Sequence, residues 1–217
     1  MKIALMDLGR RPYPEVWELQ KRLVDQRTSG TSPDTFILVE HDHVITLGRK
    51  TSAENFKPQD VPVFQVERGG DATYHGPGQL VGYPIVKMDV PDVRKFVKAL
   101  EEVLILTTNS FAIPAGRKEG HPGVWVGYKK LASIGVAVTN WVTYHGFALN
   151  VNTDMSYFRL IKPCGLDPDT MTSMEVLLGH KVDFDAVKSE VLRNFTLVFE
   201  AEPMTAQNPV STAEIRR

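Results

Sequence analysis

A glycine-rich stretch, residues 68–79, is the first place where this sequence could do chemistry. It reads Arg-Gly-Gly-Asp-Ala-Thr-Tyr-His-Gly-Pro-Gly-Gln and holds four glycines and a proline. Such a composition allows backbone amides to come very close to a ligand, and it is also typical of a long hairpin connection. No Gly-Lys-Ser or Gly-Lys-Thr occurs in the chain, so the stretch is not a phosphate-binding P-loop.

Cys164 is the second candidate, because it lies in a Lys-Pro-Cys-Gly segment with the composition of a loop. A thiol presented by a loop can be a nucleophile, whereas a structural cysteine is usually a small buried hydrophobe in an apolar run. A free thiol has a pKa of about 8.5, so a nucleophile needs help to ionise. No histidine is adjacent in the sequence, and His75 or His145 could reach the thiol only through the fold.

Lys130 is the third candidate, because it opens a segment with the alternation of a β-strand. The lysine shares a face with four apolar residues: Ala132, Ile134, Val136 and Val138. Two interpretations are open. The ammonium group can reach water from the strand end, or it can be buried beside a thiol, where it would favour the thiolate and exchange protons near neutral pH. Lys129 points the other way and is more simply a solvated charge.

Metal chemistry has no support in the sequence. The chain has no His-Glu-x-x-His motif, and a single cysteine cannot build a thiolate cluster. His41 and His43 share one face of a predicted strand, where the simplest interpretation is a polar strand end. We therefore expect no metal ion and no other cofactor.

The elements that must position these residues follow from the spacing of the apolar residues. Helices are predicted over 14–29, 92–108 and 184–199, the last with Asp183 as its N-cap. Strands are predicted over 35–40, 44–47, 61–67, 80–87, 124–127, 130–139 and 141–151. Strands in neighbouring groups predict a mixed α/β (α+β) domain with a largely antiparallel sheet flanked by helices. We expect one domain over 1–217, in which a small C-terminal subdomain could begin at about residue 155, and a loose tail over 201–217.

Composition narrows the class of protein. Lys and Arg together number 25 and Asp and Glu 26, so the net charge of -1 provides no overall basic field for nucleic acid or anionic lipid. Hydrophobic residues make up 42% of the 217 residues, enough to bury a large core. One cysteine cannot form an internal disulfide, no export signal is evident, and no apolar run reaches the roughly 18 residues of a membrane span. We expect a soluble cytoplasmic protein.

Four longer motifs extend the candidate segments. They are Arg-Gly-Gly-Asp-Ala-Thr-Tyr-His-Gly-Pro-Gly-Gln-Leu-Val-Gly-Tyr-Pro (68–84), Lys-Leu-Ala-Ser-Ile-Gly-Val (130–136), His-Gly-Phe-Ala-Leu-Asn-Val (145–151) and Pro-Cys-Gly-Leu (163–166). Together with Gly123-Val124-Trp125 they resemble the lipoyl(octanoyl) transferases, over roughly residues 10–180. The first motif is long and ordered and is therefore specific, whereas Pro-Cys-Gly alone is a weak signal.

The resemblance implies an enzyme that transfers an octanoyl group from octanoyl-acyl carrier protein to one lysine of a lipoyl domain, without ATP. The implied acceptors are the lipoyl domains of 2-oxoacid dehydrogenase E2 subunits and the glycine cleavage H protein, with no nucleic-acid or membrane partner. The implied fold is similar to the catalytic modules of biotin and lipoate protein ligases. Cys164 would hold the acyl group as a thioester, and Lys130 would activate the thiol and exchange protons.

The resemblance also implies a set of substrate-binding residues. They come from the glycine-rich stretch and from two strands: Arg68, Gly69, Gly70, Asp71, Ala72, Thr73, Tyr74, His75, Ser133, Ile134, Gly135, Gly146, Phe147 and Ala148. Tyr74, Ile134 and Phe147 would supply apolar walls, and glycines would let the acyl chain lie against bare backbone. Arg68 at the pocket mouth could meet an acidic carrier, and amides near 69–70 or Gly165 could hold an oxyanion.

Three other functions stay open on the sequence alone. A lipoate protein ligase would activate the free acid with ATP, and Cys164 would then have no covalent role. An amidotransferase would move octanoyl from one lipoyl domain to another through the cysteine. A non-catalytic module would bind acyl carrier protein or lipoyl domains without turnover and would tolerate Cys164→Ala. Nucleic-acid binding ranks last.

Overall fold

The computed structural model describes residues 1–51, 61–161 and 167–204, and these form two β-sheets. The strands of the larger sheet are β1 (Lys2–Arg11), β2 (Asp34–His41), β6 (Gln79–Ile85), β7 (Gly116–Lys118), β8 (His121–Val126), β9 (Lys129–Thr139), β10 (Val142–Asn150) and β11 (Glu202–Pro203). The strands of the smaller sheet are β3 (Val44–Leu47), β4 (Val63–Gln65) and β5 (Ala72–His75). The larger sheet has the order β11-β1-β2-β6-β10-β9-β8-β7 and the smaller β4-β3-β5.

The larger sheet is mostly antiparallel, as predicted. Only the pairs that β1 makes with β2 and with β11 are parallel among its described pairs. The helices are α1 (Tyr13–Thr28), α2 (Val93–Ser110), α3 (Met174–Leu178) and α4 (Phe184–Val198), with 3-10 helices η2 (Met155–Leu160) and η4 (Pro168–Thr170). The mixed α+β class with helices flanking the sheet is therefore confirmed. No helix in the described ranges has both the length and the apolar character needed to cross a bilayer.

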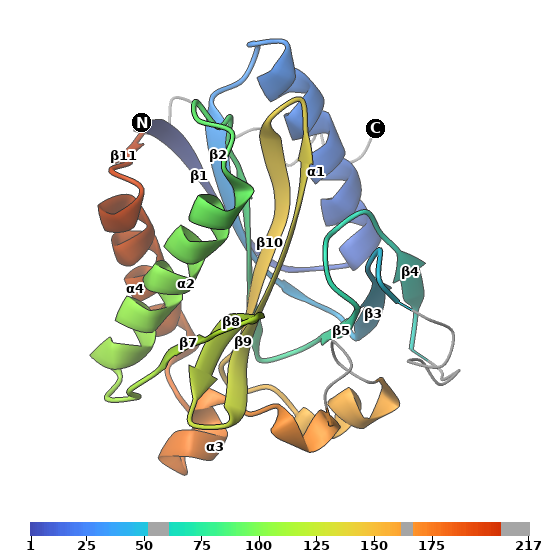
Figure 1. Ribbon diagram of the computed structural model, residues 1–217, viewed down its shortest axis with the longest axis vertical. Helices are drawn as coiled ribbons and strands as arrows, with labels where there is room; N and C mark the ends of the chain where they lie inside the picture. The colour runs from blue at the N-terminus through green and yellow to red at the C-terminus, as the bar shows by residue number, and fades with distance from the viewer. Residues whose placement is uncertain (52–60, 162–166, 205–217) are drawn as a thin grey trace.

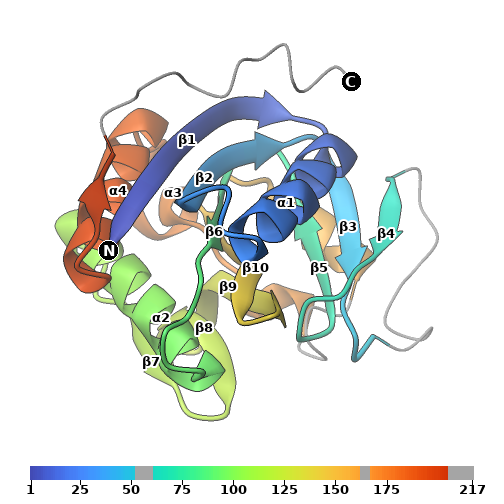
Figure 2. The same cartoon turned by 90° about the horizontal axis from the view of Figure 1, so that it is seen from above.

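Helices cover both faces of the larger sheet. In Figures 1 and 2, α2 and α4 lie together on one side of the sheet and α1 lies on the other. Because successive side chains of a strand point to opposite faces, a strand covered on both faces needs apolar residues at every position, and β2 is an example. Phe36 and Leu38 pack in the core under α2 and α4, whereas Ile37 and Val39 pack under α1. All four are at most 1% exposed, which explains the continuous apolar run that predicted this strand.

The three predicted helices are confirmed, with boundaries shifted by one or two residues. Asp183 caps α4 as predicted, since its side chain accepts hydrogen bonds from the backbone N–H groups of Asp185 and Ala186. Asp92 caps α2 in the same way by accepting from the N–H of Lys95. The two helices pack on one another as well as on the sheet, through residues such as Leu104 and Phe195.

Five strands and helices were missing from the prediction, as were the 3-10 helices η2 and η4, and one of the five is the three-residue strand β7. Strand β1 was missed because only Ile3 of its ten residues is buried, so its apolar pattern is weak. Strand β5 lies inside the glycine-rich stretch, which is therefore more than a connection. The short helix α3 was also missed, and β11 lies in the predicted tail over 201–217, where it pairs with β1. The rest of that tail, 205–217, is outside the described residues.

Gly146 in β10 shows how closely the strands of the larger sheet are packed. A Cβ atom at this position would lie 2.2 Å from the carbonyl oxygen of Gly82 on β6. We expect Gly146→Ala to lower the free energy of unfolding by about 1–3 kcal/mol, measured by urea denaturation. Gly116→Ala is the matched control, because a Cβ on this β7 glycine meets no atom within 4 Å. Equal unfolding free energies for the two variants would contradict the close packing.

Candidate active site

A pocket lies where the smaller sheet meets the larger one. About 460 Å³ of space in and above it is not filled by protein atoms, and this figure includes open solvent. Its lining comes from α1, the glycine-rich stretch, β6, β9 and β10: Tyr13, Arg68, Gly69, Gly70, Thr73, His75, Tyr83, Ser133, Ile134, Gly135, His145, Gly146, Phe147 and Ala148. All the predicted substrate-binding residues except Asp71, Ala72 and Tyr74 are in this lining. Their role in binding stays a prediction.

The alternation of β5 explains two of these exceptions. Thr73 and His75 point into the pocket, so Ala72 and Tyr74 point to the opposite side of the strand. There they are fully buried in a separate core with the 3-10 helix η2. The Tyr74 hydroxyl lies 2.8 Å from Nδ1 of His43, and its ring stacks on Tyr157. Tyr74 is thus a core residue and not the pocket wall that we expected. The third exception, Asp71, is also buried outside the lining, and its carboxylate accepts from the Ala72 N–H at 2.7 Å.

The glycines of the pocket make room for the protein itself. A Cβ on Gly135 would lie 2.9 Å from the carbonyl oxygen of Gly69 and 3.1 Å from Cδ of Arg68. The N–H of Gly69 donates to the Val136 carbonyl at 3.0 Å, which fixes the loop on β9. Gly135 therefore allows the loop to approach the strand, where we had expected bare backbone for an acyl chain. Because this hydrogen bond occupies the Gly69 N–H, that group is not free to bind an oxyanion.

Arg68 is buried beneath its own loop instead of standing at the pocket mouth. It is 7% exposed, and its Nη2 donates to the backbone oxygen and the hydroxyl of Thr46 on β3, at 2.7 and 3.0 Å. Its Nη1 donates to the Gly69 carbonyl at 3.1 Å. The guanidinium group thereby joins the pocket loop to the smaller sheet, and its positive charge lowers the pKa of both histidines of the pocket.

Both pocket histidines are neutral. Burial, followed by the nearby His41 and Arg68, lowers the pKa of His75 to about 3. Burial and the charges of Arg68 and Arg49 lower the pKa of His145 to about 3 as well. Nε2 of His145 lies 3.6 Å from the Glu67 carboxylate, but a neutral ring makes no ion pair with it. Neither ring has the pKa near 7 that suits a general base.

His41 is not the polar strand end that we expected. It is fully buried, with Nε2 2.9 Å from the Tyr83 hydroxyl and Nδ1 2.9 Å from the Arg11 carbonyl. Burial lowers its pKa to about 4. The His41 ring packs against Tyr13 and His75, two residues that line the pocket, and so helps to fix their positions.

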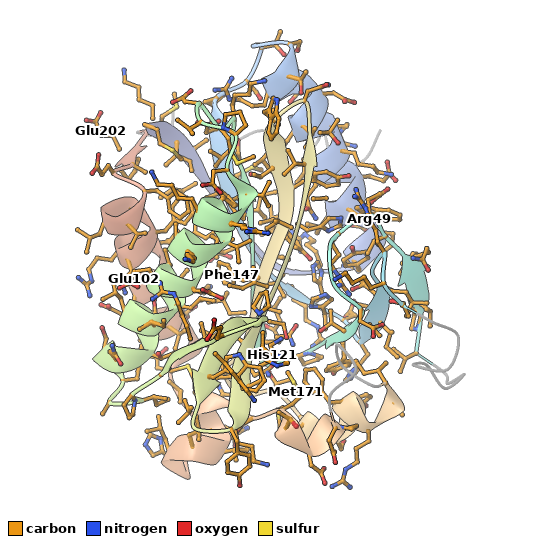
Figure 3. The ribbon with its side chains drawn as sticks, viewed as in Figure 1. Arg49, Glu102, His121, Phe147, Met171 and Glu202 are labelled. Carbon is orange, nitrogen blue, oxygen red and sulfur yellow. The ribbon has the colours of Figure 1, made fainter. Side chains whose placement is uncertain are left out.

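Lys130 is buried, which excludes the interpretation that its head group reaches water. It is 4% exposed, and Nζ lies 5.5 Å from the ring centroid of Trp125 on β8. Its backbone carbonyl accepts from the Thr172 N–H at 3.0 Å, next to a β-bridge with Met171. Figure 3 labels Met171, the bridge partner of Lys130, and His121, the first residue of β8. Lys129 turns outward, and its Nζ donates to the Asp169 carbonyl.

Cys164 lies outside the described residues, with the rest of 162–166. Ile161 and Met171 are buried in the same core as Tyr74, and Met171 forms the bridge with Lys130. Two described residues that flank the cysteine in the sequence, Ile161 and Met171, therefore lie in the core that adjoins Lys130.

A family model described as "Lipoyl protein ligase A/B catalytic domain" matches residues 12–196. The chain belongs to this family. It is 48% identical over 195 residues to the "Probable octanoyltransferase" of Pyrobaculum arsenaticum, covering 90% of this chain and 91% of the relative. It is 41% identical over 227 residues to the octanoyltransferase of Flavobacterium johnsoniae, covering 93% and 98%.

Solved structures support the fold of the lipoyl protein ligase A/B family. A crystal structure of lipoate-protein ligase A bound with ATP matches with a TM-score of 0.76 at 16% identity, covering 99% of this chain and 92% of that one. A biotin protein ligase from Aquifex aeolicus matches with a TM-score of 0.54 at 14% identity, covering 92% and 69%. The expected similarity to the catalytic modules of biotin and lipoate protein ligases is confirmed for the fold.

A buried hydrogen-bond network of this family member was missed in the sequence. Nε2 of Gln79 donates to the Tyr74 carbonyl and to Oδ1 of Asn150, so its Oε1 accepts from Nδ1 of His75 at 2.7 Å. Asn150 in turn donates to the Thr172 carbonyl at 2.9 Å. The network connects the pocket to the segment that pairs with Lys130. Gln79 and Asn150 are polar residues next to apolar runs, at the start of β6 and the end of β10, and both are buried. A polar residue that directly adjoins a buried strand was the signal that could have revealed them.

We expect the three buried histidines to make the protein sensitive to acid. The pKa values of the three histidines in the folded state lie below the ordinary value of 6.5. Below pH 6.5 the unfolded chain therefore binds protons at these histidines that the native protein does not bind. Their stabilisation is complete above pH 6.5 and is lost as the pH falls towards 3–4. As the pH falls from 7 to 5, each histidine should lower the free energy of unfolding by about 1–2 kcal/mol.

Urea denaturation from pH 7.5 to pH 5 measures this effect. His75→Gln should flatten the pH dependence of the unfolding free energy, because one protonation site is removed. His180→Gln is the control, since His180 is exposed. An unchanged slope in His75→Gln would show that His75 is protonated in the native state.

Proposed function

We propose that this protein transfers an octanoyl group from octanoyl-acyl carrier protein to one lysine of a lipoyl domain, through a thioester on Cys164. The relatives named octanoyltransferase, up to 48% identical over most of the chain, support the reaction. The observation that carries the mechanism is the burial of Lys130 and its pairing with Met171, seven residues after Cys164. An ammonium group favours the thiolate of a cysteine beside it, which is the help that a thiol nucleophile needs.

The first half-reaction exchanges one thioester for another. The Cys164 thiolate, stabilised by the Lys130 ammonium, attacks the carbonyl carbon of the donor thioester. The bond from that carbon to the pantetheine sulfur breaks, and the sulfur takes a proton from Lys130. Lys130 is then a neutral amine, and the free energy of the acyl group has changed little.

The second half-reaction forms the amide. The neutral amine of the acceptor lysine attacks the Cys164 thioester, the carbon–sulfur bond breaks, and Lys130 takes the proton released by the attacking nitrogen. This step restores the thiolate and the ammonium, and it is downhill without ATP because an amide is more stable than a thioester. Forming the intermediate on the enzyme lets two large proteins dock in turn.

The neutral histidines support Lys130 as the proton carrier, since neither pocket ring titrates near pH 7. In this proposal the pocket residues hold the octanoyl chain, and amides near Gly165 bind the oxyanion. The acceptors are the lipoyl domains of 2-oxoacid dehydrogenase E2 subunits and the glycine cleavage H protein. A single cysteine that must remain a free thiol fits a reducing compartment, which supports a cytoplasmic location.

Intact mass after incubation with octanoyl-acyl carrier protein alone tests the proposal. We expect an octanoyl increment on residue 164, which disappears when a lipoyl domain is added and the domain gains the increment. No ATP is present, so an ATP-dependent ligase would show neither increment.

Two further arms test for an amidotransferase and for a non-catalytic module. An octanoylated lipoyl domain offered as the only donor would reveal an amidotransferase. Binding of octanoyl-acyl carrier protein and of the lipoyl domain, without any transfer of the octanoyl group, would indicate a non-catalytic binding module.

A further inference from the structure

Trp125 makes an unexpected contact with Lys130. The two residues are direct partners between β8 and β9, next to a register shift that leaves Leu131 of β9 as an extra residue between this pair and the Val124–Ala132 pair. The indole is 3% exposed, and the Lys130 ammonium lies over its face at 5.5 Å from the ring centroid. A cation over an aromatic face is attracted by the ring electrons, most strongly where water is excluded.

The other side of the Lys130 head group is closed by Gly123. A Cβ on Gly123 would lie 2.7 Å from Cε and 3.4 Å from Nζ of Lys130, and its φ of +130° favours glycine. The end of the lysine therefore packs between the backbone of Gly123 and the face of Trp125. Such a slot restricts the ammonium group to a narrow range of positions.

Hydrogen bonds to neighbouring residues fix both Gly123 and Trp125 in position. The Gly123 N–H donates to Oε1 of the buried Glu101 on α2 at 3.0 Å, and Oε2 of Glu101 accepts from Nε of Arg117 at 3.0 Å. The Trp125 Nε1–H donates to the His121 carbonyl at 3.0 Å, and the His121 ring meets the indole edge-on. The two walls are thus fixed by α2, β7 and β8.

We propose that Trp125 is a positioning residue, whose ring face holds the Lys130 ammonium in place for the reaction of Cys164. This inference rests on the proposed function and names the group that orients its proton carrier. A ring face attracts an ammonium without carrying a formal negative charge. It therefore orients Lys130 without competing with a thiolate for the proton, and it leaves the amine able to deprotonate in the second half-reaction.

The charged and titratable groups around the slot are compatible with this role. Glu101 and Arg117 pair with one another behind Gly123. Lys118 on β7 places its Nζ 4.5 Å from the centroid of the same indole, and His121 lies at the ring edge. The neighbouring Lys129 directs its ammonium to the Tyr128 ring and the Asp169 carbonyl.

Fluorinated tryptophan tests the ring directly, because fluorine withdraws electron density while nearly preserving shape. The chain has three tryptophans, so Trp17→Phe combined with Trp141→Phe leaves Trp125 as the single labelled site. The readout is the pH profile of alkylation by iodoacetamide, which reports Cys164 alone since the chain has one cysteine. We expect the apparent pKa of the thiol to rise stepwise from mono- to tetrafluorination, by about half to one and a half pH units in total.

Lys130→Met supplies the decisive control. With the ammonium removed, fluorination should no longer move the alkylation profile. Three outcomes would each overturn the proposal. The wild-type Cys164 could show the apparent pKa of an ordinary thiol, fluorination could leave that pKa unchanged, or fluorination could shift it equally in Lys130→Met.

Unlabelled variants repeat the comparison if the double variant does not fold. Trp125→Leu should raise the apparent pKa more than Trp125→Phe, which keeps a ring, whereas Trp141→Phe at the exposed β9–β10 turn should leave it unchanged. Equal profiles for Trp125→Leu and Trp125→Phe would count against the ring. The profile needs no acyl donor, so it is separate from the mass test: a wild-type enzyme that never gains the octanoyl increment refutes the proposed function and not the contact.

Discussion

Replacing the Cys164 sulfur by oxygen, in Cys164→Ser, should lower kcat/KM for octanoyl transfer by about 1,000-fold or more. A serine hydroxyl is far less acidic than a thiol, so the Lys130 amine cannot generate an appreciable amount of the attacking anion. Any oxyester that does form reacts more slowly with the acceptor amine than a thioester does. The defect should therefore affect both half-reactions.

Transfer from octanoyl-acyl carrier protein to a lipoyl domain, followed by mass spectrometry of both proteins, measures this loss. Thermal unfolding of Cys164→Ser checks that the fold is intact, and the variant should not react with iodoacetamide because the chain then has no thiol. A transfer rate equal to that of the wild type would exclude a covalent role for residue 164 and would favour direct transfer or an adenylate.

Substitution of Lys130 should be nearly as severe and should separate its two roles. Lys130→Met removes both the charge and the proton acceptor, so we expect a loss of about 100- to 10,000-fold together with a higher apparent pKa of Cys164. Lys130→Arg keeps a permanent cation that cannot give up a proton. It should retain a low apparent pKa of the thiol and still accept one octanoyl group, because the pantetheine sulfur can leave as a thiolate and take its proton from water. It should then stall before the amide is formed, since no neutral amine at residue 130 takes the proton of the acceptor lysine.

Rapid-quench mass spectrometry distinguishes these outcomes. A burst of octanoyl-enzyme in Lys130→Arg, without transfer to the lipoyl domain, is the expected result. Lys129→Met is the matched control, because the adjacent lysine turns outward to Asp169 and should leave both half-reactions close to normal. Multiple turnovers by Lys130→Arg at the wild-type rate would restrict Lys130 to an electrostatic role.

Periodicity was sufficient for the main elements, because their apolar residues repeat at the spacing of the face that they bury. The three long helices and the strands around Phe36 and Ile134 were predicted for this reason. Strand β1 shows the limit, since its sequence contributes one buried side chain and its place depends on pairing with β2. A short strand such as β5 is likewise fixed by a partner distant in sequence.

The candidate site was predictable by residue type more than by geometry. The glycine-rich stretch, Lys130 and the 145–148 segment were named from the sequence, yet the burial of Lys130 could not be decided there. Whether its ammonium reaches water depends on Trp125 and Gly123 of a neighbouring strand. The contact of Gly135 with the loop was missed for the same reason, because the residues that approach it are Arg68 and Gly69, which are distant in sequence.

The position of the pocket between the two sheets has a mechanical consequence. One wall belongs to β5 of the smaller sheet, and the opposite wall belongs to β9 and β10 of the larger. Any molecule that fills the space touches both sheets. It therefore adds contacts at an interface where Arg68 fixes the pocket loop to Thr46 of the smaller sheet and the Gly69 N–H fixes it to Val136 of the larger. Because a ligand that binds only the folded state stabilises it by mass action, the protein with a molecule in the pocket should unfold at a higher temperature than the protein without one. In the protein without a ligand, local unfolding should begin at the interface between the two sheets.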